Sequence, residues 1–414
     1  MFKPTLRTVL LATVIAATGL SGLFSCKKDE DNTVSIKSAT TGGKDLSGAI
    51  AATKVGLTSN VVVKFSKEID VTTATAASVS ITAAGITGSV LSTITAAGDS
   101  IVLNPKNDLL SGTKYTLSLA GTIKSKDGGT FNAKTFTFTT FGPANIVPPR
   151  AANQIAYYPF NGTFNDNTGA FTTSATVDAK FCVDRKGNLD ASAEFNGTTT
   201  IIEIANGTNL ITTSGTVSFW VKADTTLRKG LFVMGANFFK GHLFEIAGNG
   251  EWIKSGANFV SGVDNTTEDL FYNANGLYNT TGGWQGHTFK KSEVLKNVLP
   301  AKWAHVVHTY DAATKIRSLF INGELAMSSD FNLWPPNDSK LLVSAMRTQT
   351  AGDLSTTWAF GFGKARDASF WTDTDFGDYN KPGANHFKGD LDDVRFFNIA
   401  MTSAEAIELY NLEK

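Results

Sequence analysis

The sequence contains very little cysteine and no excess of charge of either sign. Its 414 residues include two cysteines, Cys26 and Cys182, and 37 basic residues balance 37 acidic ones. Balanced charge argues against nucleic acid or an anionic membrane surface as the main partner. Two cysteines cannot supply a disulfide framework, so stability must come from apolar cores. The chain is long enough to build two or more domains around such cores.

The first 25 residues have the pattern of a secretory signal peptide. Lys3 and Arg7 precede a short apolar run over residues 9–20, and the small residue Ser25 stands directly before Cys26. The apolar run is too short to span a bilayer comfortably. The pattern resembles the bacterial lipobox, which implies that Cys26 is acylated and begins the mature chain. An ordinary cleaved signal with an incidental cysteine is the alternative.

Residues 26–32 are expected to form a lipidated tether. The charged run KKDED at residues 27–31 is typical of a solvated segment. It also resembles the tail of surface-exposed lipoproteins of the Bacteroidetes, which implies an outer-membrane protein that faces the cell surface. Acyl chains contribute about 0.8 kcal/mol per buried methylene, so anchoring requires no transmembrane helix. We expect none after residue 26.

Residues 33–141 contain short runs in which apolar and polar side chains alternate. This alternation predicts β-strands with one buried face, and several such strands in about 110 residues favour a Greek-key sandwich. The runs VVVKFSKEID, DSIVLNP and FTFTT resemble those of bacterial Ig-like domains in cell-surface proteins. The resemblance implies a spacer or interaction module. Residues 142–152, which are rich in proline and have no periodicity, are predicted to be a linker.

Residues 153–414 are again rich in predicted strands. The motifs IAYYPFNG, AEFNG, TVSFWVK, KWAHVVHTYD, SLFINGE and FKGDLDDVRFF follow one another along this region. Their order resembles the concanavalin A-like jelly roll of laminin G-type (LamG) domains, a fold that hosts lectins, adhesion modules and glycosidases alike. Thr402 and Glu405 form a capping-box pattern that predicts one short helix at the C-terminal end. The expected fold class is therefore all-β, with two successive sandwiches and one short C-terminal helix.

No catalytic centre is expected. Glu68 and Asp70 begin the Glu-x-Asp-x-x-Glu pattern of laminarinase-type glucanases, but Thr73 occupies its third acidic position. A retaining glycosidase needs two carboxyl groups about 5–5.5 Å apart. His305 and His308 are separated by two residues on a predicted strand, so they should lie on opposite faces. We therefore expect a protein that is not an enzyme.

Three acidic residues are candidate ligands for a structural calcium ion. Asp166 follows the first predicted strand of the second region, and Asp392 and Asp393 lie on its last strand. The terminal strands of a jelly roll tend to lie side by side, and Ca²⁺ prefers six to eight hard oxygen ligands. Adjacent buried aspartates are costly unless they are paired or bound to metal. For Asp392 or Asp393, the alternative is capping of loop amides or pairing with Arg185 or Arg395.

Two long, turn-rich insertions, residues 236–291 and 348–386, are the candidate binding loops. Loops on a rigid sandwich commonly carry binding function. Aromatic rings stack on the apolar faces of sugars, and nearby Asp, Asn and Arg side chains hydrogen-bond sugar hydroxyls. Packing of the aromatic residues onto the sandwich is the alternative. The candidate carbohydrate-binding residues are Trp252, Trp284, Trp358, Trp371 and Tyr379.

The leading hypothesis is a surface lipoprotein that binds carbohydrate, for glycan capture or adhesion, through loops of the LamG-like region. The Ig-like region would act as its spacer. A glycoside hydrolase or lyase on the same fold is a second hypothesis, and a purely structural or protein-binding envelope component is a third. The sequence alone indicates neither the particular glycan nor the oligomeric state.

Overall fold

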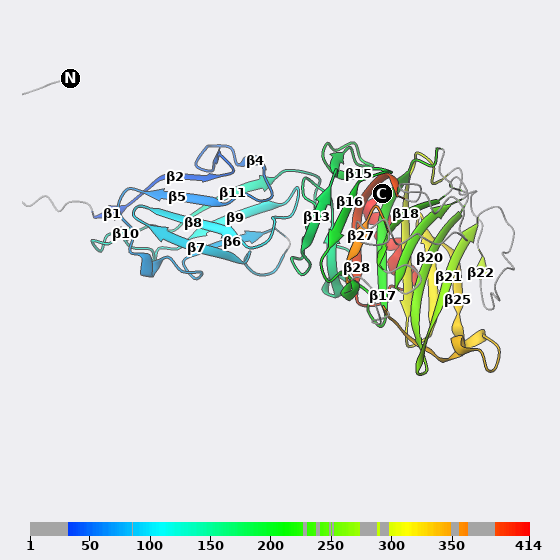
Figure 1. The fold of residues 1–414 in the computed structure, drawn as a ribbon. Coiled ribbons are helices and arrows are strands. Elements are labelled where there is room, and N and C mark those ends of the chain that lie inside the picture. The colour runs from blue at the N-terminus through cyan, green and yellow to red at the C-terminus, as the bar shows by residue number, and fades with distance from the viewer. Residues whose placement is uncertain are drawn as a thin grey trace, which may run out of the picture.

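The computed structural model describes residues 32–414, apart from 85, 227–229, 237–240, 248–249, 251, 274–287, 290–297, 349–355 and 363–385. Two β-sandwiches follow one another along the chain and lie end to end (Figure 1). The expected all-β class, with one short helix near the C-terminal end, is confirmed. No helix within the described ranges is long and apolar enough to cross a membrane.

The N-terminal unit contains a four-stranded sheet in the order β4-β11-β9-β6 and a five-stranded sheet in the order β3-β2-β5-β8-β7. Short strands β1 and β10 pair separately. Its strands are β1 Thr33–Val34, β2 Ile36–Thr41, β3 Lys44–Asp45, β4 Ala52–Val55, β5 Val61–Phe65, β6 Val79–Ala83, β7 Ser92–Ala97, β8 Ser100–Pro105, β9 Lys114–Leu119, β10 Thr130–Phe131 and β11 Lys134–Thr140.

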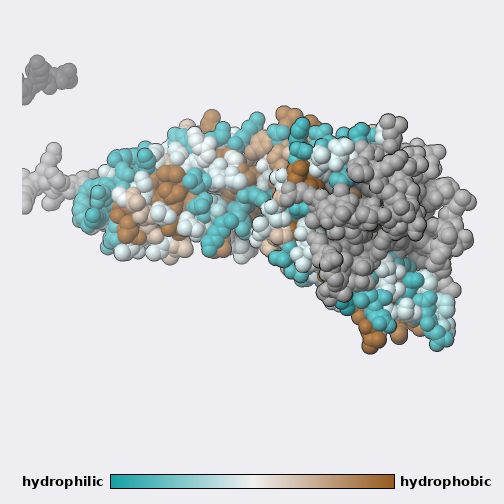
Figure 2. All heavy atoms as spheres, in the orientation of Figure 1, coloured by the Kyte–Doolittle hydropathy of each residue, from teal (hydrophilic) through white to brown (hydrophobic). Residues whose placement is uncertain are grey.

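Alternating apolar side chains of the two sheets form the core of the N-terminal unit. Val61, Val63 and Phe65 of β5 face inward, while Leu117 and Phe138 come from the opposite sheet, and all five are fully buried. Burial of large apolar side chains contributes about 1.5–3 kcal/mol each. The face of this unit that Figure 2 shows is a mixture of hydrophilic and neutral residues with separate hydrophobic patches.

The C-terminal sandwich consists of two larger sheets. One has the order β14-β15-β28-β17-β23-β24-β25-β22 with β12 paired to β28, and the other has the order β13-β16-β27-β18-β19-β20-β21 with β26 paired to β20. We call them the first and the second sheet. The strands are β12 Gln154–Tyr158, β13 Thr173–Val177, β14 Lys180–Cys182, β15 Ser192–Asn196, β16 Ile201–Ile204, β17 Gly215–Ala223, β18 Gly230–Ala236, β19 His242–Ala247, β20 Trp252–Ser261, β21 Asp264–Asn273, β22 Thr288–Phe289, β23 Trp303–Asp311, β24 Ile316–Ile321, β25 Glu324–Asp330, β26 Val343–Met346, β27 Trp358–Phe360 and β28 Lys388–Phe397.

The first sheet has an outer face that is partly covered by helix α1 (Ser403–Glu413). Thr402 and Glu405 form the predicted capping box at its N-terminus. Asn322 and Gly323 both have positive φ and connect β24 to β25, as expected of a two-residue hairpin turn. A side chain on Gly323 would overlap the ring of Tyr410, so this glycine also allows α1 to pack closely on the hairpin.

Polar contacts join the two units. The Thr163 hydroxyl donates to Asp108 at 2.6 Å, and the Asn165 amide donates to the same carboxylate at 3.1 Å. The Asn161 amide donates to Ser111 at 2.9 Å in a buried position. Asp108 and Ser111 belong to the loop before β9, and the other three residues follow β12. The two units are therefore joined by side-chain hydrogen bonds as well as by the linker.

Candidate functional site

The predicted lipidation site and most of the predicted loop aromatics lie outside the described residues. These are Cys26, Trp284, Trp371 and Tyr379. Trp252 begins strand β20, but the structure describes only its backbone. The roles assigned to these residues remain predictions.

Trp358 is a correction to the prediction of a loop platform. It begins β27, which pairs with β16 and with β18, and its side chain is fully buried. Its ring lies edge-on to Phe396 at 5.1 Å and to His242 at 6.0 Å between the centroids. A residue enclosed between both sheets cannot contact a glycan, so Trp358 belongs to the core.

Asp166 has a structural role that the sequence analysis did not predict. Its loop runs along the outer edge of β12, where the Asn167 N–H donates to the Tyr157 carbonyl at 2.8 Å. A carboxylate that accepts several backbone N–H bonds fixes such a loop strongly. The N–H groups that donate to Asp166 are those of Tyr157 at 2.8 Å, Thr168 at 3.0 Å, Ala170 at 3.0 Å and Phe171 at 3.1 Å.

Asp392 and Asp393 pair with Arg185, the second alternative considered for them. One guanidinium nitrogen of Arg185 donates to Asp392, and another donates to Asp393 at 2.6 Å. Asp393 has a positive φ, which interrupts the strand alternation and lets both neighbours face the same guanidinium. The Tyr157 hydroxyl also donates to Asp393. These buried carboxylates are thus engaged by cationic and hydroxyl donors.

The residues present do not fit a calcium ion. The oxygens of Asp166 face backbone N–H groups, and those of Asp392 and Asp393 face a guanidinium, so each is bound by donors that a cation would have to displace. In the part of the chain that the structure describes, no three His, Cys, Asp or Glu side chains are grouped to hold a metal.

Helix α1 packs against this charged cluster on the outer face of the first sheet. Glu413, in its last turn, is fully buried and accepts from the Arg395 guanidinium at 2.7 Å and from the Trp220 indole at 2.9 Å. The Arg185 guanidinium stacks on the Trp220 ring at 4.4 Å and donates to the Glu413 backbone carbonyl at 2.8 Å. The cluster therefore ties the helix to β17 and β28.

Three carboxyl groups share two guanidinium groups in this cluster. Burial and the neighbouring charge of Asp393 raise the pKa of Asp392 well above its ordinary value. Burial opposes ionisation of Asp393 as well, but Arg185 and Arg395 outweigh it and hold the pKa of Asp393 below its ordinary value. Burial, together with the charge of Asp393, raises the pKa of Glu413 as well. Asp393 is therefore the carboxylate of the three that the two guanidinium groups hold ionised most strongly.

His305 and His308 lie on opposite faces of β23, as predicted. His305 packs between Trp220 and Tyr410 under α1. His308 faces the interior of the sandwich, where its Nε2 accepts from Arg317 at 2.8 Å. Burial lowers the pKa of His305 to about 3 and that of His308 well below its ordinary value, with help from Arg185 and Arg317 respectively. Both rings are neutral and structural at physiological pH.

An open row of side chains crosses the outer face of the first sheet beside α1. Direct cross-strand pairing aligns Trp303 with Lys222, Lys222 with Asp390, Asp390 with Glu194, and Glu194 with Lys180. Trp303, Lys222 and Asp390 are half-buried, while Glu194 and Lys180 are exposed. We call these five residues the Trp303 row.

The Trp303 row combines an aromatic ring with hydrogen-bonding groups of both charges. The Lys222 ammonium lies 6.0 Å from the centroid of the Trp303 ring and 3.0 Å from the Asp390 carboxylate. Cross-strand neighbours have Cβ atoms about 4.5–5.5 Å apart, so the five side chains form a continuous strip. Such a strip can stack one apolar face of a ligand and hydrogen-bond its hydroxyl groups.

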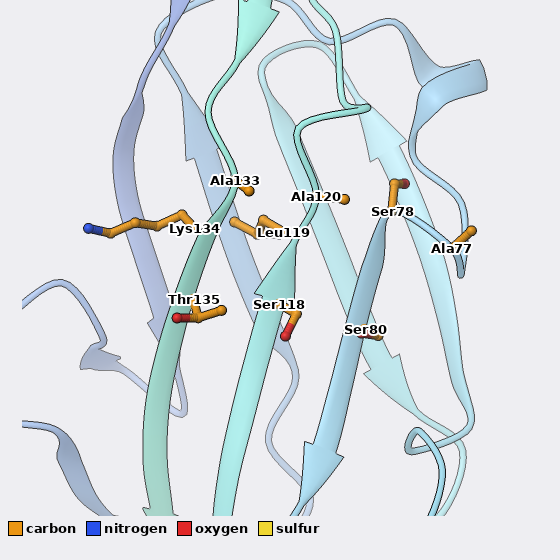
Figure 3. Close-up of a pocket in the computed structure, with 9 residues that line it drawn as sticks. All are labelled: Ala77, Ser78, Ser80, Ser118, Leu119, Ala120, Ala133, Lys134 and Thr135. Carbon is orange, nitrogen blue, oxygen red and sulfur yellow. The ribbon is translucent and has the colours of Figure 1, made fainter.

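A shallow hollow of about 450 Å³ lies on the N-terminal unit (Figure 3). Its walls are mainly the small side chains of β6, β9 and β11, including Ser80, Ser118 and Thr135. Lys134 is the one lining residue with a charge, and none carries an aromatic ring. These walls offer neither a nucleophile–base pair nor a stacking surface.

Two family models match the chain. The bacterial Ig-like domain model matches residues 44–140, and the concanavalin A-like lectin/glucanases superfamily model matches residues 196–362. The chain joins a bacterial Ig-like domain to a concanavalin A-like domain. The N-terminal unit is the Ig-like domain, and the C-terminal sandwich is the concanavalin A-like domain. A search of curated protein sequences gives no match.

Several botulinum neurotoxin binding domains are similar solved structures. The receptor binding domain of the C/D mosaic serotype has a TM-score of 0.40 and 15% identity, with 63% of this chain and 52% of that chain covered. The serotype D ligand binding domain, solved in complex with N-acetylneuraminic acid, has a TM-score of 0.40 and 15% identity, with 63% and 51% covered. The chain thus spans about half the length of these proteins.

Trp303 is the candidate residue that sequence reasoning missed. It stands at the start of the KWAHVVHTYD motif, which indicated a strand of the fold and no binding role. Alternation with the buried Ala304 and Val306 was the available signal, because it places Trp303 on the outer face. The pairing with Lys222 and Asp390 depends on strands 80 or more positions away, as the Lys222–Trp303 register shows.

Proposed function

We propose that this protein binds carbohydrate through its concanavalin A-like domain. The Trp303 row is the observation that carries the proposal. A half-buried indole lies next to charged side chains that offer donors and acceptors along the same strip. Because the row belongs to paired strands, its geometry is fixed before a ligand arrives, which lowers the entropic cost of binding.

We further propose that the protein acts at the cell surface as a lipoprotein. The lipobox-like sequence around Cys26 supports outer-membrane anchoring, and the Ig-like domain would hold the binding domain away from the membrane as a spacer. The hydrogen bonds from Thr163 and Asn165 to Asp108 support this role, because they favour one orientation of the two domains.

The protein is proposed to bind without cleaving its ligand. Glu194 and Asp390 are direct cross-strand neighbours, and a retaining glycosidase also uses two carboxyl groups near each other. Asp390, however, is already engaged by the Lys222 ammonium at 3.0 Å. A glycosidase at Glu194 and Asp390 is therefore the second candidate function.

Affinity gel electrophoresis with a panel of polysaccharides tests both candidates. Binding predicts slower migration in at least one polysaccharide gel, with no new reducing ends after prolonged incubation. Glycosidase activity predicts reducing ends that disappear in Glu194→Gln and in Asp390→Asn. Unchanged migration across a broad panel, with no product, would contradict both and favour a structural or protein-binding component. Trp284→Ala and Trp371→Ala, tested in parallel, determine whether the predicted loop aromatics contribute.

A further inference from the structure

Strand β7 of the Ig-like domain is an unprotected sheet edge. It ends the five-stranded sheet, and its pairing with β8 continues over six residues without a bulge. Residues 92–97 include no charge and no proline. Thr93, Thr95 and Ala97 are exposed, and the preceding Leu91 is 65% exposed. Proteins normally blunt such an edge with charges, proline, bulges or covering segments.

Other edge strands described in this protein carry that protection. β3 is two residues long, and β14 is three residues long and begins with Lys180. The bridge between Thr82 and Ser89 covers part of the outer edge of β6. The Asp166 loop covers β12, and a register shift interrupts β13. β7 has none of these forms of protection along its six residues.

The hydrogen-bond pattern shows which groups β7 presents outward. The Lys106 N–H donates to the Leu91 carbonyl at 2.9 Å, so residue 91 belongs to a hydrogen-bonded pair with β8. Because such pairs alternate along an antiparallel ladder, the N–H and C=O groups of Ser92, Ile94 and Ala96 point away from β8. No backbone hydrogen bond from the described residues reaches these groups.

We infer that β7 pairs in antiparallel fashion with β7 of a second copy of this chain. A two-fold axis at Thr95 would place Ile94 of each copy opposite Ala96 of the other, so that outward donors meet outward acceptors. The side chains favour this partner, because Thr93, Thr95 and Ala97 bring no like charges together, and opposed threonines are favourable cross-strand pairs. The five-stranded sheets of the two copies then continue into each other.

A single six-residue strand makes a small contact. It is well below the interface of about 1,600 Å² that is typical of stable complexes, so the association is weak and depends on concentration. Self-pairing is independent of carbohydrate binding, because the Trp303 row lies on the other domain.

Sedimentation velocity over a concentration series of the purified protein tests the inference. The weight-average sedimentation coefficient of the wild type should rise with concentration. Thr95→Lys should remain monomeric, because it places like charges opposite each other at the pairing edge. Thr135→Lys is the matched control, since Thr135 is also exposed but lies on β11 between two paired strands. It should associate like the wild type.

An equimolar mixture of Thr95→Lys and Thr95→Glu tests directly whether β7 pairs with β7. If β7 pairs with itself, the mixture should regain association, because lysine then faces glutamate across the two-fold axis. A wild type that stays monomeric at every concentration would overturn the inference. Association that Thr95→Lys leaves unchanged, or that the mixture fails to restore after Thr95→Lys has abolished it, would overturn it as well.

Discussion

The Trp220 indole N–H donates to the Glu413 carboxylate at 2.9 Å, although the two residues are 193 positions apart. Glu413 also accepts from the buried guanidinium of Arg395 at 2.7 Å. The last turn of α1 is therefore bound to the centre of the first sheet through a buried charge.

Replacing Glu413 should destabilise the concanavalin A-like domain strongly. Removal of one partner of a buried ion pair costs about 3–5 kcal/mol, because the remaining charge is left buried without compensation. Glu413→Ala should lower the free energy of unfolding in urea by this amount. Glu408→Ala, at an exposed position of the same helix, should change it by at most about 0.5 kcal/mol. Equal effects of the two variants would show that the helix is not held by this cluster.

His242 should make folding sensitive to mild acid. Burial, assisted by the nearby charge of Arg317, lowers the pKa of His242 to about 3, whereas in the unfolded chain it is about 6.5. Between these values only the unfolded state binds the proton, so stability falls as pH decreases. The expected loss from this one group between pH 7 and pH 5 is about 2 kcal/mol.

Urea unfolding at pH 7 and pH 5 measures this effect by comparison with His242→Gln. Glutamine does not titrate, so the variant should lose about 2 kcal/mol less stability than the wild type between the two pH values. Subtracting the two curves removes the contributions of the other titrating groups. An identical loss in both proteins would mean that His242 becomes protonated in the folded state.

The orientation of the two domains should depend on Asp108. Asp108→Ala removes the acceptor for both Thr163 and Asn165 and leaves the linker intact. We expect faster proteolysis within residues 142–150 and a broader distance distribution in small-angle X-ray scattering. Asp45→Ala is the control, because the one hydrogen bond described for the Asp45 side chain is the one it accepts from the Ser47 N–H in its own domain. If the two variants behave alike, the polar contacts at the junction do not set the orientation.

Local patterns in the sequence were sufficient for the fold class, the alternating strands and the helix cap. Val217, Phe219 and Val221 point into the core as their spacing indicates, and the Thr402–Glu405 box begins α1. Each of these features depends on residues that lie only a few positions apart in the sequence. Such features follow from side-chain periodicity and local hydrogen bonding alone.

The candidate site could not be predicted in the same way, because its residues are brought together by pairing between strands that are far apart in the sequence. Trp358 stands in a turn-rich stretch that resembled a loop, yet tertiary pairing with β16 and β18 places it in the core. For Asp392 and Asp393, pairing with Arg185 was an alternative that the sequence could not select over calcium, because Arg185 lies more than 200 positions earlier. The Trp303 row likewise exists only after five separate strands pair with one another.

The central claim is tested most directly by the migration of Trp303→Ala in an affinity gel. The gel should contain the polysaccharide that slows the wild type most strongly. Loss of one aromatic stacking surface should weaken retention at least several-fold, while Trp303→Phe retains much of it. The urea unfolding curve of Trp303→Ala should stay close to that of the wild type, since the ring is half-buried on the outer face. Retention equal to that of the wild type in a folded Trp303→Ala protein would contradict the account.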